Sequence, residues 1–342
     1  MTSTCLRVYF QQPYRVEVCT EPCPAPGPDE VLVQTEASAV SAGTELLFYR
    51  GQVPDDLPVD AILDGLQATV AYPLAYGYAA VGAVVATGNN VPSSWLRRRV
   101  FAFQPHASHF VCKATALQLV PDSMASATAA LFPNVETAVN LVMDAAPMVG
   151  ERAVIMGQGV VGLLTLHLLR KFPLASIAVV DAYPLRRELA RKWGASAALS
   201  PAEYAHDPGD PDLIIEVSGS PQALDAAVRT AGFAGRVVIG SWYGQKPAQL
   251  TLGGQFHRNR VRLVSSQVST IAPQHTGRWD KARRSALAWR LLHQIPTDDL
   301  VSHRYPLQDA PTVYRRLDEQ PETMLQVIFQ YEPALLQQRA HA

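Results

Sequence analysis

A glycine-rich segment carries the most specific chemistry in this sequence. Gly157, Gly159 and Gly162 are spaced as G-x-G-x-x-G, between an apolar run at 153–156 and a helical pattern at 160–171. In such a turn the first glycine permits the bend, the second lets the backbone approach a pyrophosphate, and the third lets the helix pack close to its strand. We therefore predict that a dinucleotide binds at Gly157, Gln158, Gly159, Val160, Val161 and Gly162.

An acidic residue follows where the ribose of such a cofactor would lie. Asp181 closes the next predicted strand, at 177–180, and comes 19 residues after Gly162. A carboxylate at that strand end can bind both ribose hydroxyls of NAD, and it repels the 2′-phosphate of NADP. We therefore expect NAD(H) as the cofactor, with NADP(H) as the less favoured alternative. Arg186 and Arg187 keep that alternative open, because they could approach a 2′-phosphate. They could also simply form an exposed helix face.

Strands and helices alternate from about residue 151 onward, and this rhythm positions the glycine turn. Predicted strands lie at 153–156, 177–180, 213–217 and 236–239, and predicted helices lie at 160–171, 185–193 and 222–230. Such alternation predicts an α/β fold with a doubly wound parallel sheet, the Rossmann arrangement, covered by helices on both faces.

The first 120 residues follow a different pattern, in which short runs of valine, alanine and aromatic residues are separated by glycine and proline. This is typical of short antiparallel strands in a barrel or sandwich. A single helical pattern spans 123–143, and a strand-like run at 325–329 lies near the end. We predict two domains: a β-rich one at 1–122, completed by 296–342, and a dinucleotide-binding one at 123–295.

The composition excludes several other classes of protein. Of 342 residues, 48% are hydrophobic and 17% are charged, with 29 basic against 30 acidic side chains. This balance excludes a disordered chain and gives no electrostatic reason to bind nucleic acid. The longest apolar runs fall well short of the ~20 residues that a membrane span needs, and the N-terminus has no signal-peptide core. We expect a cytoplasmic protein whose partner is a small molecule, with no nucleic-acid or membrane partner.

Four cysteines, at 5, 19, 23 and 112, are few for a chain of this length. Cys19 and Cys23 could form half of a metal site, but a second pair is missing and prolines flank Cys23. We expect all four to be ordinary cytosolic thiols.

The order of these parts resembles the medium-chain dehydrogenase/reductase superfamily over nearly the whole chain. Segments similar to its motifs begin at Ala42 (AGTE), Gly77 (GYAAVGAV), Arg99 (RVFA), Gly194 (GA) and Glu216 (EVSGSPQAL). The resemblance implies hydride transfer with a nicotinamide cofactor, and a partly open GroES-like barrel as the catalytic domain. It also implies that Ser218, Gly240 and Ser241 contact the nicotinamide.

The positions that bind catalytic zinc in the zinc alcohol dehydrogenases of this superfamily are occupied differently here. The first is Ala42, the second is Tyr78 with Ala79 beside it, and the third falls near Pro133. None of these side chains is a plausible zinc ligand, and the four-cysteine lobe that holds structural zinc in those enzymes is missing. The chain therefore resembles a zinc-free branch, and most closely the group that includes bacteriochlorophyllide a dehydrogenase.

Without zinc, a hydrogen-bond donor must polarise the carbonyl oxygen. Thr44 stands where the superfamily has its proton-relay hydroxyl, and Tyr78 could place its phenol in the volume of the missing metal. Glu45 occupies a carboxylate position next to the metal site, and His106 falls at the start of a strand that lines the cleft in relatives. These four residues are the catalytic candidates. Structural alternatives stay open, with Tyr78 as a space filler and Glu45 in an inward salt bridge.

Three further residues are candidates for contact with the substrate. Asn134 and Glu136 lie on the predicted helix before the glycine turn, where they could bind the nicotinamide ribose or the substrate. His257 lies on the loop after the predicted strand at 236–239, and it either contacts substrate or cofactor or is held within its own loop.

Together these residues predict an NAD(H)-dependent, zinc-independent oxidoreductase that interconverts a secondary alcohol and a ketone. Two alternatives stay open. One is a zinc-free reductase of C=C bonds in enones or quinones, which needs no strong acid in its site. The other is a dinucleotide-binding redox sensor without turnover.

The strand-like run at 261–268 should form an edge of the Rossmann sheet. A long apolar edge strand is a liability if it stays open to solvent. In relatives this edge pairs with its two-fold mate, so the resemblance implies a homodimer. The alternative is a monomer in which the following segment covers the edge.

Overall fold

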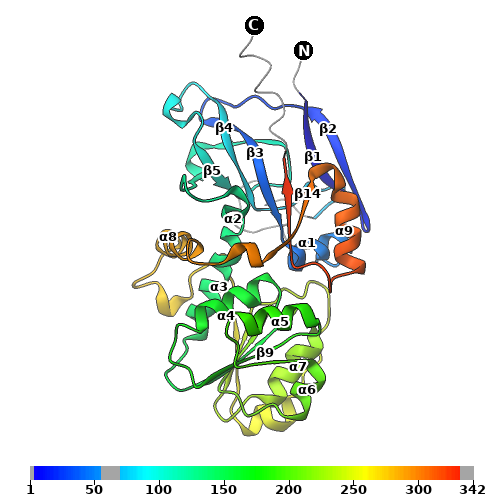
Figure 1. Ribbon diagram of the computed structural model, residues 1–342, viewed down its shortest axis with the longest axis vertical. Helices are drawn as coiled ribbons and strands as arrows, with labels where there is room; N and C mark the ends of the chain where they lie inside the picture. The colour runs from blue at the N-terminus through cyan, green and yellow to red at the C-terminus, as the bar shows by residue number, and fades with distance from the viewer. Residues whose placement is uncertain (1–3, 55–69, 332–342) are drawn as a thin grey trace. The chain divides into compact units, whose positions relative to one another are not determined.

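The computed structural model describes residues 4–54 and 70–331, whose elements are labelled in Figure 1. The chain divides into two compact units, one of Met1–Leu131 with Val301–Ala342 and one of Phe132–Leu300. These limits lie later in the chain than the predicted limits at 122/123 and 295/296.

Hydrogen bonds explain the first of these shifts. The short helix α2 (Ser126–Ala129) belongs to the first unit, because Ser126 Oγ donates to the Glu36 carboxylate of that unit's sheet. The single helix predicted over 123–143 is therefore two helices. The second, α3, begins at Phe132 with Pro133 in its first turn, the one part of a helix where proline loses no hydrogen bond.

The second unit contains a six-stranded parallel sheet in the order β10-β9-β8-β11-β12-β13. Its strands are β8 (Arg152–Met156), β9 (Ser176–Val180), β10 (Ala197–Leu199), β11 (Leu213–Glu216), β12 (Arg236–Ile239) and β13 (Arg262–Ser265). Its helices are α3 (Phe132–Ala145), α4 (Val160–Leu169), α5 (Pro184–Lys192), α6 (Pro201–His206), α7 (Pro221–Thr230) and α8 (Lys281–Leu292), with short helical turns η3 (Leu252–Phe256), η4 (Pro273–His275) and η5 (Thr297–Asp299). This strand order is the doubly wound one, so the predicted Rossmann fold is confirmed.

The central strands are apolar along their whole length because helices cover both faces of such a sheet. Every residue of β11 is buried, and so are the last four residues of β8. The strand order reverses between β8 and β11, and ligands of doubly wound sheets bind outside the carboxyl ends of the strands at that point. The residues that follow Met156 and Glu216 are therefore the ones to examine for a cofactor.

The first unit is rich in β-structure, as predicted. β1 (Thr4–Gln12) and β2 (Arg15–Pro22) form an antiparallel pair. A seven-stranded sheet runs in the order β14-β15-β3-β4-β5-β7, with β6 also paired to β3. Its strands are β3 (Glu30–Val40), β4 (Ala80–Thr87), β5 (Arg99–Ala102), β6 (His109–Lys113), β7 (Gln118–Leu119), β14 (Val301–Pro306) and β15 (Gln326–Gln330). The helices are α1 (Ala42–Tyr49), α2 and α9 (Ala310–Glu319), with short turns η1 (Ser93–Trp95), η2 (Ala114–Ala116) and η6 (Leu307–Asp309).

The C-terminal segment completes the core of the first unit. β15 pairs antiparallel with β3, with Val327 opposite Val40. From α9, the Tyr314 ring packs edge-on against Phe10 of β1, with ring centroids 4.9 Å apart. Tyr314 is fully buried in the apolar cluster that also holds α1. The end of the chain therefore fixes α1, the helix that carries Thr44 and Glu45.

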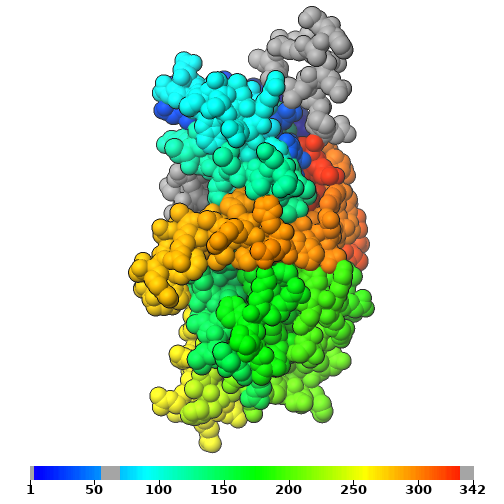
Figure 2. All heavy atoms as spheres, turned by 60° about the vertical axis from the view of Figure 1, so that its left-hand side comes forward, coloured from blue at the N-terminus to red at the C-terminus, as the bar shows by residue number. Residues whose placement is uncertain are grey.

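The surface of the second unit includes the segment from β13 to α8, coloured yellow to orange in Figure 2. Among the described residues, no helix is both long and apolar enough to cross a membrane.

Candidate active site

The glycine turn lies between β8 and α4, and its three glycines serve different purposes. Gly157 has φ +96°, and a Cβ there would stand 2.6 Å from Ser218 Cα. At Gly162 a Cβ would stand 1.9 Å from the Gly157 carbonyl oxygen, so the packing of α4 requires glycine. At Gly159, the N-cap of α4, a Cβ would meet no atom within 4 Å. The backbone of Gly159 therefore faces open space at a helix N-terminus, where a pyrophosphate fits.

Asp181 is oriented by backbone groups on both sides. Its Oδ2 accepts a hydrogen bond from Gln158 N at 2.6 Å, and its Oδ1 accepts one from Tyr183 N at 2.8 Å. The carboxylate is buried beside the glycine turn. Because each carboxylate oxygen has two lone pairs, it can still accept a hydrogen bond from a ribose hydroxyl.

The two arginines after Asp181 take different positions. Arg187 donates to the carbonyl oxygens of Asp181 and Ala182, at 2.7 and 2.9 Å, so it holds the loop at the end of β9. The Arg186 guanidinium lies 4.7 Å from the centre of the Tyr183 ring. Both arginines therefore have a contact within the protein that does not depend on the 2′-phosphate of NADP.

Gln158 is fully buried in the glycine turn. Its Nε2 donates to the Gly157 carbonyl oxygen at 2.9 Å, whereas its buried Oε1 has no hydrogen-bond partner in the described residues. Buried amide oxygens are nearly always paired. The Gln158 Oε1 atom is therefore an unpaired acceptor inside the turn.

The predicted nicotinamide contacts gather at the carboxyl ends of β11 and β12. Glu216, at the end of β11, accepts from Ser218 N at 2.8 Å and from the Tyr243 hydroxyl. Ser241 Oγ accepts from Gly219 N at 2.8 Å and so joins the two strand ends. Burial and the Glu216 carboxylate raise the pKa of Tyr243 above its usual value, so its hydroxyl stays a donor.

Gly240 belongs to the same strand-end cluster. A Cβ at this position would lie 2.6 Å from a methyl group of Leu141 in α3. Ser218, Gly240 and Ser241 are thus brought together next to the glycine turn. Glu216 organises them, a role that the sequence motif alone did not indicate.

The three predicted substrate contacts are not joined into one cluster. Glu136 in α3 lies 3.3 Å from Nε of Arg284, which also donates to Asn140 Oδ1 at 2.7 Å. Burial raises the pKa of Glu136, and Arg284 opposes that shift. Asn134 is buried in the first turn of α3, whereas His257 is exposed after η3. The structure therefore gives Glu136 the role of fixing α3 to α8, which corrects its prediction as a substrate contact.

In the first unit, a polar cluster surrounds the N-terminus of α1. The Tyr78 hydroxyl donates to Ser41 Oγ, and Ser41 is the N-cap of α1. Thr44 lies in the first turn and is half-buried, as Tyr78 is. Two hydroxyl-bearing candidates are thus partly accessible near the start of this helix.

Glu45, in the same turn, is completely buried. Its Oε1 accepts from Ser41 N at 2.7 Å, and its Oε2 accepts from the Tyr314 hydroxyl and lies 3.1 Å from His106 Nε2. Burial and the Glu45 charge raise the pKa of Tyr314 well above its usual value. Glu45 therefore keeps three donors and anchors the start of α1.

His106 is also completely buried. Its Nδ1 lies 2.7 Å from Ser38 Oγ, which in turn lies 2.8 Å from the Tyr331 hydroxyl. Gly77, at φ +120°, makes room for the ring, because a Cβ there would stand 2.7 Å from His106 Cδ2. Each ring nitrogen of His106 therefore has one polar partner, Ser38 at Nδ1 and Glu45 at Nε2.

These contacts bear on two of the four catalytic candidates. Glu45 and His106 are buried with their polar atoms paired, an arrangement that favours a positioning role over contact with a substrate. Glu45 points inward to His106, Ser41 N and Tyr314, as its structural alternative expected. The sequence analysis did not identify four residues of this cluster: Ser38, Ser41, Tyr314 and Tyr331. Only the fold brings Tyr314 to Glu45 and Tyr331 to Ser38.

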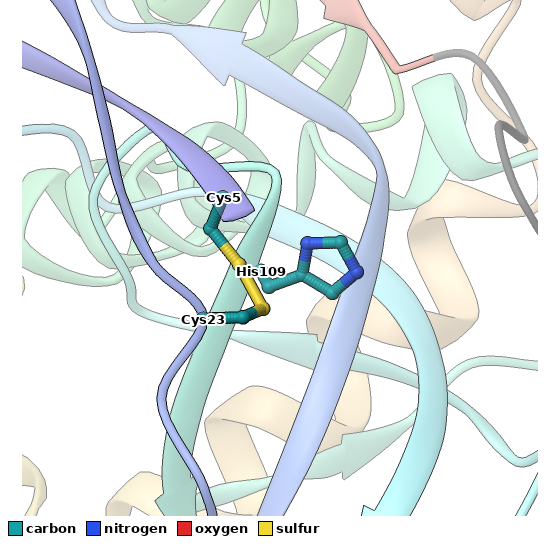
Figure 3. A group of neighbouring side chains, drawn as sticks. All are labelled: Cys5, Cys23 and His109. Carbon is teal, nitrogen blue, oxygen red and sulfur yellow. A yellow bond between two sulfur atoms is a disulfide. The ribbon is translucent and has the colours of Figure 1, made fainter. Parts of the chain in front are cut away.

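The residues around α1 do not fit a zinc ion. In the part of the chain that the structure describes, the ligand-type side chains bonded at the start of α1 are Glu45 and His106, and a buried pair of this kind falls short of the three protein ligands of a catalytic zinc site. Within the described residues, one group of three or more histidine, cysteine or acidic side chains has the spacing for a metal: Cys5, Cys23 and His109. Cys5 and Cys23 form a disulfide, which corrects the expectation of four free thiols (Figure 3).

Comparisons with known proteins agree with this fold. Residues 160–284 match the family described as zinc-binding dehydrogenase. A D-guloside 3-dehydrogenase of Escherichia coli (strain K12) is 24% identical over 327 residues, which cover 87% of this chain and 92% of that protein.

Two solved structures have the same architecture. One is a short chain alcohol dehydrogenase from E. coli CFT073 in complex with NADH, with a TM-score of 0.77, 18% identity, and coverage of 96% of this chain and 99% of that chain. The other is zinc dependent alcohol dehydrogenase 2 from Streptococcus pneumonia, also with a TM-score of 0.77, 18% identity, and coverage of 96% and 99%. The combination of a GroES-like and a Rossmann domain is therefore confirmed.

Proposed function

We propose that this chain, whose residues 160–284 match the zinc-binding dehydrogenase family, is a dehydrogenase of the medium-chain dehydrogenase/reductase superfamily that interconverts a secondary alcohol and a ketone with NAD(H), without catalytic zinc. One observation carries the zinc-free part. Two hydrogen-bonded hydroxyl groups, on Tyr78 and Ser41, stand at the start of α1, where Ala42 and Tyr78 replace the superfamily's metal ligands.

The cofactor half of the proposal rests on the second unit. The open space at Gly159 and the N-terminus of α4 would receive the pyrophosphate, and Asp181 would bind the ribose. Ser218, Gly240 and Ser241 would line the nicotinamide side. When bound, the nicotinamide supplies or accepts the hydride.

The protein's own contribution to the reaction is proton transfer and polarisation of the substrate oxygen. In alcohol oxidation the substrate hydroxyl loses its proton as its carbon loses hydride. Tyr78 and Thr44 are the proposed catalytic residues, because both are half-buried hydroxyl-bearing residues at the α1 N-terminus. In ketone reduction the same hydroxyl groups donate hydrogen bonds to the oxygen that becomes negative.

Glu45 and His106 act through these hydroxyl groups rather than on the substrate. The Glu45 carboxylate accepts from Ser41 N at 2.7 Å and so fixes the residue that accepts the Tyr78 hydrogen bond. His106 supports Glu45 from the opposite side. The pair therefore fixes the N-cap on which the geometry of Tyr78 depends.

Substitution of Tyr78 tests the catalytic assignment. Tyr78→Phe should lower kcat about 100-fold, the usual cost of removing one donor to the reacting oxygen. The affinity for NAD(H) should stay unchanged, since Tyr78 is not part of the dinucleotide cradle. Tyr9→Phe, which removes a hydroxyl bonded to Glu21 elsewhere in the first unit, is the matched control. Full activity of Tyr78→Phe would leave Tyr78 as a space filler.

A substrate panel tests the reaction type. Secondary alcohols should reduce NAD⁺, whereas enones and quinones should not oxidise NADH at a comparable rate. The opposite result would favour the C=C reductase, whose chemistry needs no acid stronger than water at the site.

Cofactor fluorescence tests the preference for NAD(H). The orientation of Asp181 by Gln158 N supports binding to unphosphorylated ribose, so NAD(H) should bind at least about tenfold more tightly than NADP(H). Tighter binding of NADP(H) would remove Asp181 from this role and bring Arg186 into it.

A further inference from the structure

Three side chains of types that can bind metals lie close together in the first unit and take no part in the proposed reaction. They are Cys5 in β1, Cys23 just after β2, and His109 at the start of β6. One ligand atom from each lies within 4.8 Å of the others. Figure 3 shows the imidazole of His109 next to the two bonded sulfur atoms. Cys5 is buried, and the other two are half-buried.

Regular backbone pairing holds the three side chains together. Cys5 lies opposite Glu21 in the antiparallel pair of β1 and β2, so the chain reaches Cys23 two residues later. Ser108 connects this pair to β6, because Ser108 N donates to Leu6 O and Leu6 N donates to Ser108 Oγ, each at 2.8 Å. The group is therefore assembled by three segments that meet in one place.

Ser108 also orients the imidazole of His109. Its Oγ lies 3.1 Å from His109 Nδ1. Histidines that bind metals commonly hold one ring nitrogen with a neighbouring polar group while the other faces the metal. Such a contact restricts the ring before any ion arrives.

In the disulfide form, both sulfur atoms are occupied by their mutual bond. Reduction by a dithiol or a phosphine transfers two electrons to this bond, and Cys5 and Cys23 each gain one proton. A dithiol becomes a disulfide and passes its two protons to the cysteines, whereas a phosphine becomes a phosphine oxide by taking its oxygen from a water molecule, which supplies the two protons. The two thiols and the imidazole then form a sulfur- and nitrogen-rich ligand set, which zinc and cobalt prefer over magnesium or calcium.

We propose that the reduced chain binds one soft divalent cation, with zinc as the natural candidate, through Cys5, Cys23 and His109, and that the disulfide excludes this cation. Binding releases the two thiol protons, because thiolates are the ligands. Ligand atoms around tetrahedral zinc stand roughly 3.5–3.8 Å apart, given bond lengths of about 2.0–2.3 Å. The sulfur atoms reach that separation once their bond is broken, and the irregular segment around Cys23 can accommodate the change.

Cobalt titration of the full chain tests this site. The protein is reduced with a phosphine, freed of reductant, checked for native circular dichroism and titrated with Co²⁺ alone. We expect one Co²⁺ per chain, a thiolate-to-cobalt charge-transfer band, and loss of that band on addition of Zn²⁺. The disulfide form should show no band. Absence of the band in the reduced, folded chain, or equal binding by the disulfide form, would overturn the proposal.

Variants assign the ligands. Cys5→Ser, Cys23→Ser and His109→Gln should each weaken binding by more than about 100-fold, since loss of an outer-shell partner alone costs 10–100-fold. Cys19→Ser and Cys112→Ser are the matched controls, because these free cysteines lie outside the group, and both should bind as the wild type does. Undiminished binding in His109→Gln or Cys23→Ser would refute the site. The titration requires no catalysis, so its result is independent of the proposed reaction.

Discussion

The buried carboxylate of Glu45, in the first turn of α1, accepts a hydrogen bond from the hydroxyl of Tyr314 in α9, although the two residues are 269 positions apart. The same carboxylate accepts from Ser41 N and lies beside His106. The start of α1 is therefore held by the far end of the chain.

Removal of the Tyr314 hydroxyl should destabilise the first unit. A hydrogen bond to a buried charge contributes about 2 kcal/mol, and its loss leaves Glu45 underpaired. Tyr314→Phe should therefore lower the free energy of unfolding by about 2 kcal/mol in urea denaturation. Tyr9→Phe, whose hydroxyl bonds to Glu21 near the surface, should change it by less than about 0.5 kcal/mol. Equal stability of the two variants would contradict the role given to Tyr314.

This contact also marks what the sequence could and could not predict. The glycine turn, Asp181 and the order of strands in the second unit follow from local spacing, because each depends on residues close together in the chain. The pairing of Cys5 with Cys23 and the burial of His106 depend on how β1, β2 and β6 meet, which no local pattern encodes. The burial of Glu45 and His106 was not predicted for the same reason, since a position near the site in the sequence gives no information on burial.

Substitutions at two glycines of the turn should distinguish an effect on cofactor binding from an effect on folding. Gly159→Ala adds a methyl group in open space, so the fold should keep its melting temperature while NAD(H) affinity falls at least about tenfold. Gly162→Ala places its methyl group 1.9 Å from the Gly157 carbonyl oxygen, so it should lower the melting temperature as well. Thermal melting measures the stability of the two variants, and fluorescence titration measures their affinity for NAD(H). Unchanged affinity in Gly159→Ala would move the dinucleotide elsewhere.

His167 should make stability depend on pH. Burial, with Arg170 and Lys171 nearby, lowers the pKa of His167 to about 4, below its ordinary value of 6.5. The unfolded chain therefore binds a proton that the folded chain does not, and stability is lost as the pH falls from 6.5 toward 4.

Comparison with a variant isolates this effect. Between pH 7 and pH 4.5, the wild type should lose about 2 kcal/mol more unfolding free energy than His167→Gln, which does not titrate. Urea denaturation at both pH values measures the difference. Parallel loss in the two proteins would show that His167 is protonated in the folded state.

The edge of the Rossmann sheet supports a homodimer. β13 is the last strand in the sheet order, pairs with β12, and carries the exposed side chain of Leu263. Val261, the first residue of the predicted edge run at 261–268, is buried in the core of the second unit, so it does not belong to the proposed dimer contact. Two β13 strands related by a two-fold axis would cover Leu263.

Light scattering at micromolar concentration should report about twice 37.2 kDa for the wild type. Leu263→Lys should shift the protein toward the monomer. Val149→Lys, at an exposed residue outside the edge, should not. A wild type that stays monomeric when its concentration is raised tenfold would contradict the assignment.

The central claim is that Tyr78 and Thr44, rather than a zinc ion, act on the substrate oxygen. The most direct measurement is dehydrogenase activity against zinc content in the disulfide form of the protein, before and after exhaustive chelation. We predict well under one zinc per chain and an activity that changes by less than about twofold on chelation, because the three metal-ligand positions fall at Ala42, at Tyr78 and near Pro133. Activity that disappears on chelation and returns in proportion to one added zinc per chain would contradict the account.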